Sequence, residues 1–167
     1  MTRTVLWAIA ISTGAALIQS TILSRLSILN TVPDLKLGVL VYVSYVNGVM
    51  TGQTLGFSSG ILLDFISAAP LGYNAFVRTI IGALTGLLKG TFFLDILVLP
   101  MALCASATIT KAFIAWIVSI LFAGTVPHYS LASPILWTEM AYNVVTAPFL
   151  FAFLNLFKSV LRPRKDN

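Results

Sequence analysis

Six long apolar runs follow one another along the chain, separated by short segments of polar residues, glycine and proline. Strands of a membrane barrel would alternate apolar and polar side chains, whereas segment 114–122 is apolar at every position except Ser119. The pattern therefore predicts membrane-spanning helices of about 20 residues each. We expect these helices near residues 5–23, 34–50, 52–68, 73–90, 100–123 and 135–157.

The composition supports a membrane location. Of the 167 residues, 58% are hydrophobic and only 9% are charged, and the mean hydropathy is +0.97. Soluble domains are only about half apolar. A chain of this length has room for about five or six spans with short loops. We therefore expect an all-α integral membrane protein, with one polytopic domain over residues 1–167 built as a bundle of about six helices.

The basic residues predict an orientation. With six spans, Arg3, Lys89 and the basic tail at 158–167 share one side of the membrane, whereas Arg25 and Lys36 lie on the other. Because basic residues concentrate on the cytoplasmic side, both termini are expected in the cytoplasm. Five spans would instead place the tail outside. The tail is expected to set orientation or to contact anionic lipid, with docking of a cytoplasmic protein as the alternative.

Glycine recurs at every fourth position from Gly48 through Gly52 and Gly56 to Gly60, and the next step of this ladder is Asp64. If the second and third spans are separate helices, the polar and glycine residues at 47–53 must form a very tight turn. Gly48 and Gly52 would then serve the turn, and only Gly52, Gly56 and Gly60 would line the helix face.

A second series, Gly82, Gly86 and Gly90, has the same spacing in the fourth span, and Asp95 follows five residues later. Two such stripes in successive helices suggest an internal repeat and favour close antiparallel packing, although glycine is common in membrane helices and one stripe alone could arise by chance. The candidate positions for bundle packing or for binding a partner helix are Gly52, Gly56, Gly60, Gly82 and Gly86.

A turn at Pro70 and Gly72 connects the third and fourth spans. Asp64 precedes the middle of this turn by about six residues and Arg78 follows it by about eight, which gives them similar depths. A lone charge in hydrocarbon costs on the order of 3 kcal/mol on insertion scales, so an ion pair across the hairpin is the favoured interpretation. The alternative is a polar site, with Asn74, that faces a partner helix or a ligand.

The last two spans carry further polar groups. Lys111 lies near the centre of the fifth span and Glu139 about one turn into the sixth, so their backbone depths differ by roughly 12 Å and no pair is assigned. Lys111 is expected to snorkel, to meet another carboxylate of the bundle, or to face a subunit. Glu139, Tyr142 and Asn143 share a helix face, and Pro148 should bend that helix. The intramembrane polar residues singled out are Asp64, Asn74, Arg78, Lys111, Glu139 and Asn143.

The inventory of reactive residues argues against an enzyme. Cys104 is the only cysteine and His128 the only histidine, so an internal disulfide and a His/Cys metal cluster are excluded. His128 is expected to be an ordinary loop residue, and the chain has no phosphate-binding glycine-rich motif. We expect no cofactor and no metal. The net charge of +5 does not indicate nucleic acid, because four basic residues crowd the C-terminal tail.

Several short segments together resemble the rod shape-determining protein MreD family, and the resemblance covers nearly the whole chain in order. Length, span count and basic tail also agree with it. The matching pieces are Pro33, Asp34 and Leu35; Gly56, Phe57, Gly60 and Asp64; Pro70, Leu71, Gly72, Asn74, Ala75 and Phe76; and Glu139, Tyr142, Asn143 and Pro148.

The resemblance implies a non-enzymatic scaffold in the bacterial cytoplasmic membrane that supports rod shape and lateral peptidoglycan synthesis. It implies binding to the single-span protein MreC. It also implies association with MreB, RodZ, the RodA glycosyltransferase and a class B penicillin-binding transpeptidase.

An alternative from another class is the vitamin-binding subunit of an energy-coupling-factor transporter, which this chain resembles in size, span number and expected fold. Such subunits bury a small ligand near the outer face. A weak stripe of small residues at Ala8, Ser12 and Ala16 would be its contact surface. The expected polar pocket would be built by Asp64, Asn74, Arg78, Glu139 and Asn143.

Overall fold

A computed structural model describes residues 2–21, 31–67, 69–91, 97–122 and 132–161, and every element in these ranges is a helix. One of these helices, α5, is long and apolar enough to cross a membrane by length and composition. The helices, in chain order, are α1 (Thr2–Thr21), α2 (Leu35–Asn47), α3 (Val49–Ile66), α4 (Tyr73–Leu87), α5 (Val98–Leu121), α6 (Pro134–Leu156) and the short α7 (Lys158–Leu161). The prediction of an all-α protein is confirmed. Two residues named in the sequence analysis, Asp95 and His128, lie outside the described residues.

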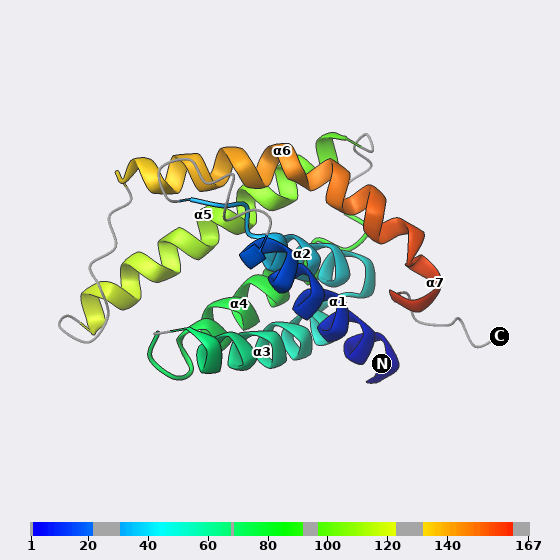
Figure 1. The fold of residues 1–167 in the computed structure, drawn as a ribbon, viewed down its shortest axis with the longest axis horizontal. Helices are drawn as coiled ribbons and strands as arrows, with labels where there is room; N and C mark the ends of the chain where they lie inside the picture. Colours follow the sequence, from blue (N-terminus) through cyan, green and yellow to red (C-terminus); the bar gives the residue numbers. More distant parts are fainter. Residues whose placement is uncertain (1, 22–30, 68, 92–96, 123–131, 162–167) are drawn as a thin grey trace.

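Helix α2 lies at the centre of the bundle and contacts α1, α3, α4, α5 and α6 (Figure 1). Its eight consecutive residues from Leu37 to Ser44 are all buried. The Ser44 hydroxyl in this run donates to the Leu40 carbonyl at 2.6 Å, so this polar group is satisfied although it is enclosed. Tyr42 packs edge-to-face on Phe151 of α6, with ring centroids 5.2 Å apart.

The junction between α2 and α3 is a single residue, Gly48, which ends one helix and begins the next. Its amide donates to the Ser44 carbonyl at 2.7 Å and its carbonyl accepts from the Gly52 amide at 3.0 Å. The φ of +98° and ψ of −176° belong to a region that essentially only glycine occupies. The predicted tight turn is therefore confirmed at Gly48, whereas Gly52, which was expected to serve the turn as well, lies inside α3.

The glycines of α3 face α4, and the two helices run side by side (Figure 1). A methyl group built on Gly52 would lie 2.8 Å from the carbonyl carbon of Gly82. One built on Gly86 would lie 2.6 Å from the amide nitrogen of Val49. Because these neighbours are backbone atoms, they cannot move aside without separating the helices.

The same contact continues toward the hairpin. A methyl group on Gly56 would lie 2.7 Å from the carbonyl carbon of Arg78, and one on Gly60 would lie 2.6 Å from the amide nitrogen of Ala75. Gly90 does not belong to this face, because α4 ends at Leu87 and Gly90 lies beyond it with a φ of +73°. The glycine stripes of α3 and α4 thus pack against one another.

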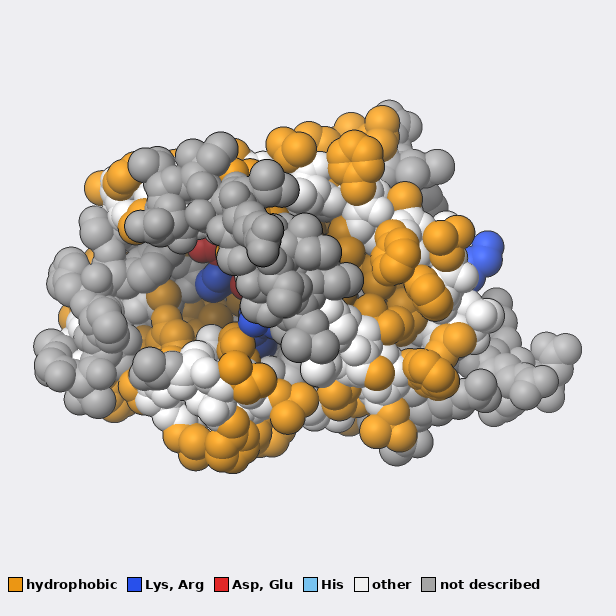
Figure 2. All heavy atoms as spheres, viewed as in Figure 1, with side chains coloured by type: hydrophobic (Ala, Val, Ile, Leu, Met, Phe, Trp, Pro, Cys, Tyr) orange, Lys and Arg blue, Asp and Glu red, His pale blue; other side chains and the backbone are white. Residues whose placement is uncertain are grey.

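The outside of the bundle carries many large apolar side chains (Figure 2). Phe65, Phe149 and Leu156 are each more than 70% exposed, at 71%, 75% and 77%. Such a surface is typical of contact with lipid or with other proteins.

Helix α6 curves along its length, and Pro148 lies inside it (Figure 1). Proline donates no backbone hydrogen bond, so the Val144 carbonyl loses its helical partner and the helix bends. Beyond α6, α7 packs against α1 and buries Leu161, whose carbonyl accepts from the Asn47 side chain at 2.9 Å. The start of α1 and the short α7 therefore lie at the same end of the bundle.

Candidate functional site

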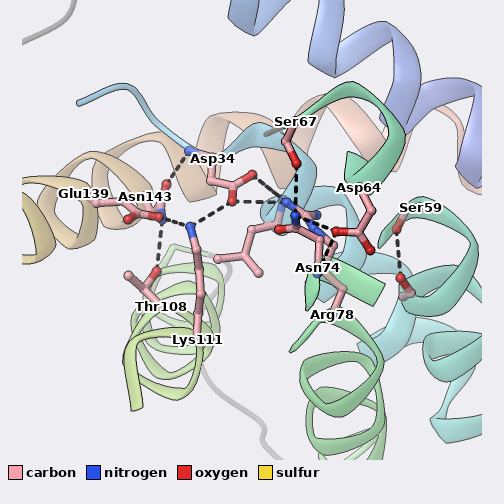
Figure 3. Close-up of polar contacts among 12 residues, drawn as sticks. Asp34, Ser59, Asp64, Ser67, Asn74, Arg78, Thr108, Lys111, Glu139 and Asn143 are labelled. Atoms are coloured by element: carbon pink, nitrogen blue, oxygen red, sulfur yellow. Dashed lines mark hydrogen bonds and ion pairs between the residues drawn. The ribbon is translucent and has the colours of Figure 1, made fainter. Parts of the chain in front are cut away.

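Asp34 lies at the centre of a charged cluster at the start of α2. Its carboxylate accepts the Leu37 amide at 3.0 Å and so caps the helix. The Nη2 atom of Arg78 lies 3.3 Å from both carboxylate oxygens, and the Nζ atom of Lys111 lies 3.2 Å from one of them. Only 10% of the Asp34 side chain is exposed. One buried carboxylate thus joins α2, α4 and α5 (Figure 3).

Asn143 of α6 holds the backbone of Asp34 in place. Its side-chain oxygen accepts the Asp34 amide at 2.8 Å, and its Nδ2 donates to the Thr108 hydroxyl at 3.0 Å. Both ends of the buried amide are therefore used, as a buried polar group requires. Asn143 connects the start of α2 with α5 and α6.

Lys111 bridges two carboxylates, because it also contacts Glu139 of α6. No pair was assigned from the sequence because the backbone depths of Lys111 and Glu139 were compared as if α5 and α6 were parallel. In Figure 1 the two helices diverge strongly. A lysine side chain is also long enough to cover part of a difference in depth. Of the expectations for Lys111, contact with carboxylates of the bundle is the one observed.

The predicted ion pair between Asp64 and Arg78 is wrong. The Asp64 carboxylate instead accepts the amides of Gly72 and Asn74 at 2.9 Å each, the amide of Ala75 at 3.2 Å, and the Asn74 side chain at 2.9 Å. These donors lie at the N-terminus of α4, where the residue in the capping position, Gly72, has no side chain to cap with. Asp64 satisfies the free amides from the neighbouring helix, and the positive end of the helix dipole stabilises its charge.

A cavity of about 280 Å³ opens beside the Asp34 cluster. Figure 2 shows acidic and basic side chains at the bottom of a hollow, with apolar atoms below them. Four of the polar residues predicted from the sequence line this cavity: Asn74, Arg78, Lys111 and Glu139. Asp64 and Asn143 are not among its described lining residues, but Asp64 accepts a hydrogen bond from Asn74 and Asn143 accepts one from the Asp34 amide. Its described lining is Gln19, Thr31, Val32, Asp34, Lys36, Leu37, Leu63, Asn74, Val77, Arg78, Ile81, Lys111, Ile135 and Glu139.

The cavity lining carries an uneven charge. Three described lining residues are cationic, Lys36, Arg78 and Lys111, and two are anionic, Asp34 and Glu139. The formal balance is therefore one positive charge. The Arg78 side chain is only 6% exposed. Its Nη1 atom is buried and has no hydrogen-bond partner among the described residues.

Sequence reasoning did not single out Asp34 as a site residue, although it lies in one of the segments that resemble the MreD family. One signal was available, because Asp34 follows Pro33 and directly precedes an apolar run, which is a typical helix-capping position.

Among the residues that the structure describes, the site shows no arrangement typical of catalysis. The charged groups are held by one another, and no group of three or more His, Cys, Asp or Glu residues in the described ranges is placed to hold a metal ion. Cys104 is buried in α5. The geometry instead joins four helices through ion pairs and leaves a cationic cavity beside them.

The comparison with known families agrees with the resemblance. The family model described as rod shape-determining protein MreD matches residues 1–157. The chain belongs to the MreD family. The match includes every helix from α1 to α6, and with them the Asp34 cluster and the glycine-packed hairpin. Searches of curated proteins and of solved structures gave no match. Membership supports a role in rod shape determination.

Proposed function

We propose that this chain is a non-enzymatic membrane scaffold of the bacterial cell-elongation complex. The observation that carries the proposal is the match to the MreD family over residues 1–157. The architecture is consistent with it, because the charged residues of the site join helices and the bundle presents a broad apolar exterior. The family match also favours a scaffold over the vitamin-binding subunit of a transporter.

We further propose that α1 to α6 all cross the cytoplasmic membrane and that both termini lie in the cytoplasm. In support, the start of α1, Lys89 and α7 gather at one end of the bundle, and the Pro70 hairpin lies at the other (Figure 1). Helix α2 has only 13 residues, or about 20 Å. Its enclosure by other helices supports a short span, since irregular backbone at membrane depth is tolerated where protein surrounds it.

The principal proposed partner is MreC, with RodA, a class B penicillin-binding transpeptidase, RodZ and MreB reached through it or directly. The glycines at 52, 56, 60, 82 and 86 are occupied by the contact between α3 and α4. A partner helix is therefore expected on the lipid-facing surface, where side chains such as Phe149 and Leu156 are exposed.

The test is co-purification. The chain is expressed with an affinity tag beside MreC, extracted in mild detergent and captured through the tag. The scaffold proposal expects MreC to be retained, and no vitamin to raise the melting temperature of the captured protein. Loss of MreC together with stabilisation by a vitamin would instead support the transporter subunit. A ligand at 100 times its Kd adds about 2.7 kcal/mol of stability, which a melting experiment resolves.

A further inference from the structure

We propose that the charged cavity binds the phosphate group of an anionic membrane phospholipid. This inference rests on the proposed membrane location but not on the proposed binding of MreC. Four properties of the cavity carry it: an arginine nitrogen without a hydrogen-bond partner among the described residues, a surplus positive charge in the described lining, a suitable volume, and apolar residues in that lining.

The unused donor is the Nη1 atom of Arg78. The Nη2 atom of the same guanidinium contacts both oxygens of Asp34 at 3.3 Å, whereas Nη1 is buried and has no partner among the described residues. Buried donors are nearly always satisfied in folded proteins, and those of arginine suit carboxylate and phosphate oxygens best. Arg78 is one of the residues of the cavity wall, so this nitrogen lies beside the cavity.

The surplus charge specifies the ligand's charge. Asp34 and Glu139 offset two of the three cationic residues in the described lining, which leaves a single positive charge. A net charge near hydrocarbon is costly, so a ligand with one negative charge is favoured. Lys36 takes part in none of the three ion pairs at Asp34 and Glu139. It is therefore the residue whose charge the ligand balances.

The volume and opening favour a lipid as the source of the phosphate. A space of about 280 Å³ corresponds to roughly nine water molecules at about 30 Å³ each, which is enough for a phosphate with part of its headgroup. The lining also includes apolar residues, and one of them, Ile135, is 53% exposed. A phosphodiester fits because it carries one charge and its acyl chains can remain on the apolar exterior shown in Figure 2.

The experiment measures binding to the purified full-length protein in detergent. The probes are short-chain phosphatidylglycerol, which is singly anionic, short-chain phosphatidylcholine, which has no net charge, and inorganic phosphate. We expect phosphatidylglycerol to raise the melting temperature more than either other probe at equal concentration. Equal effects of the two lipids would overturn the proposal. An equal effect of inorganic phosphate would overturn the lipid as the source and leave a free anion.

The variant Lys36→Gln removes the surplus charge without breaking an ion pair at Asp34. We expect it to weaken phosphatidylglycerol binding about tenfold, which corresponds to about 1.4 kcal/mol, while the melting temperature without lipid stays close to that of wild type. Lys158→Gln is the matched control, since Lys158 is exposed on α7 outside the cavity lining. Equal losses in the two variants would overturn the proposed site.

A second variant, Arg78→Lys, keeps the charge but removes the planar pair of nitrogens. It should retain the preference for the anionic lipid and lose part of the affinity.

A protein partner that supplied a carboxylate would give another result: Lys36→Gln would lose MreC, and wild type would show no lipid preference, which contradicts the proposal. If MreC fails to co-purify but the lipid preference and its loss in Lys36→Gln remain, only the proposed scaffold function fails.

Discussion

Replacing Asp64 by asparagine should destabilise the hairpin between α3 and α4 although no ion pair is lost. Each oxygen of the Asp64 carboxylate accepts two hydrogen bonds, Oδ1 from the amide and side chain of Asn74, and Oδ2 from the amides of Gly72 and Ala75. An asparagine has only one acceptor oxygen, so two of the four bonds must be lost and two donors then face an NH₂ group.

The structure sets the size of the effect. Hydrogen bonds to charged groups each contribute about 1.5–3 kcal/mol, and two are lost, so the sum begins at about 3 kcal/mol. Loss of the favourable interaction with the helix dipole adds about 0.3–1 kcal/mol. The lower end is expected, because Gly72 is exposed and water can reach part of the turn. The matched variant Asn74→Ala removes only one bond to the carboxylate, together with a longer contact to Ser67 at 3.4 Å, and should cost about 1.5 kcal/mol.

The assay is unfolding of the purified protein in mixed micelles with increasing sodium dodecyl sulfate, followed by tryptophan fluorescence. A loss below about 0.5 kcal/mol for Asp64→Asn would refute the capping role. The double exchange Asp64→Arg with Arg78→Asp gives a second check. Since these residues do not form a pair, the double variant should be no more stable than the single variants. A double variant that recovers the stability of wild type would be evidence for the hairpin ion pair and against the structure.

Three further predictions concern other parts of the bundle, each measured by the same unfolding assay. Asp34→Asn should cost about 3–5 kcal/mol, because it leaves the buried Arg78 without its carboxylate and the partly exposed Lys111 with Glu139 alone; a loss under 1 kcal/mol would contradict the central role of Asp34. Gly56→Ala should cost about 1–3 kcal/mol by forcing α3 from α4, whereas Gly14→Ala, where the added methyl meets nothing within 4 Å, should be neutral or stabilising; equal effects would refute the packing argument. Gly48→Ala should cost about 1–3 kcal/mol from backbone strain at a φ of +98°, and a neutral result would refute the proposed turn geometry.

Hydrophobic patterning predicted the helices well because an apolar run of this length has few other stable states in a membrane. The contact between α3 and α4 was also predictable. A spacing of four residues keeps Gly52, Gly56 and Gly60 on one helix face, and a short connection at Pro70 makes the following helix its antiparallel neighbour. The first two residues of the Gly82 stripe then meet them, whereas Gly90 lies past the end of α4.

The charge pairing was predicted less well, because depth alone does not decide which groups meet. Asp64 and Arg78 were expected at similar depths across the hairpin. The Asp64 carboxylate instead accepts hydrogen bonds from the free amides at the start of α4. The partner of Arg78 is Asp34, 44 residues earlier in the chain. This contact follows from the rotation and crossing of α2, α4 and α5, and a single sequence without its tertiary contacts does not specify these.

The most direct test of the scaffold proposal is cell width after depletion of this chain from the bacterium that encodes it, with expression of wild type or Asp34→Asn from a second copy. The account predicts that depleted cells lose rod shape and become wide or round, that wild type restores normal width, and that Asp34→Asn restores it poorly. Rods of normal width that persist after complete depletion would contradict the account.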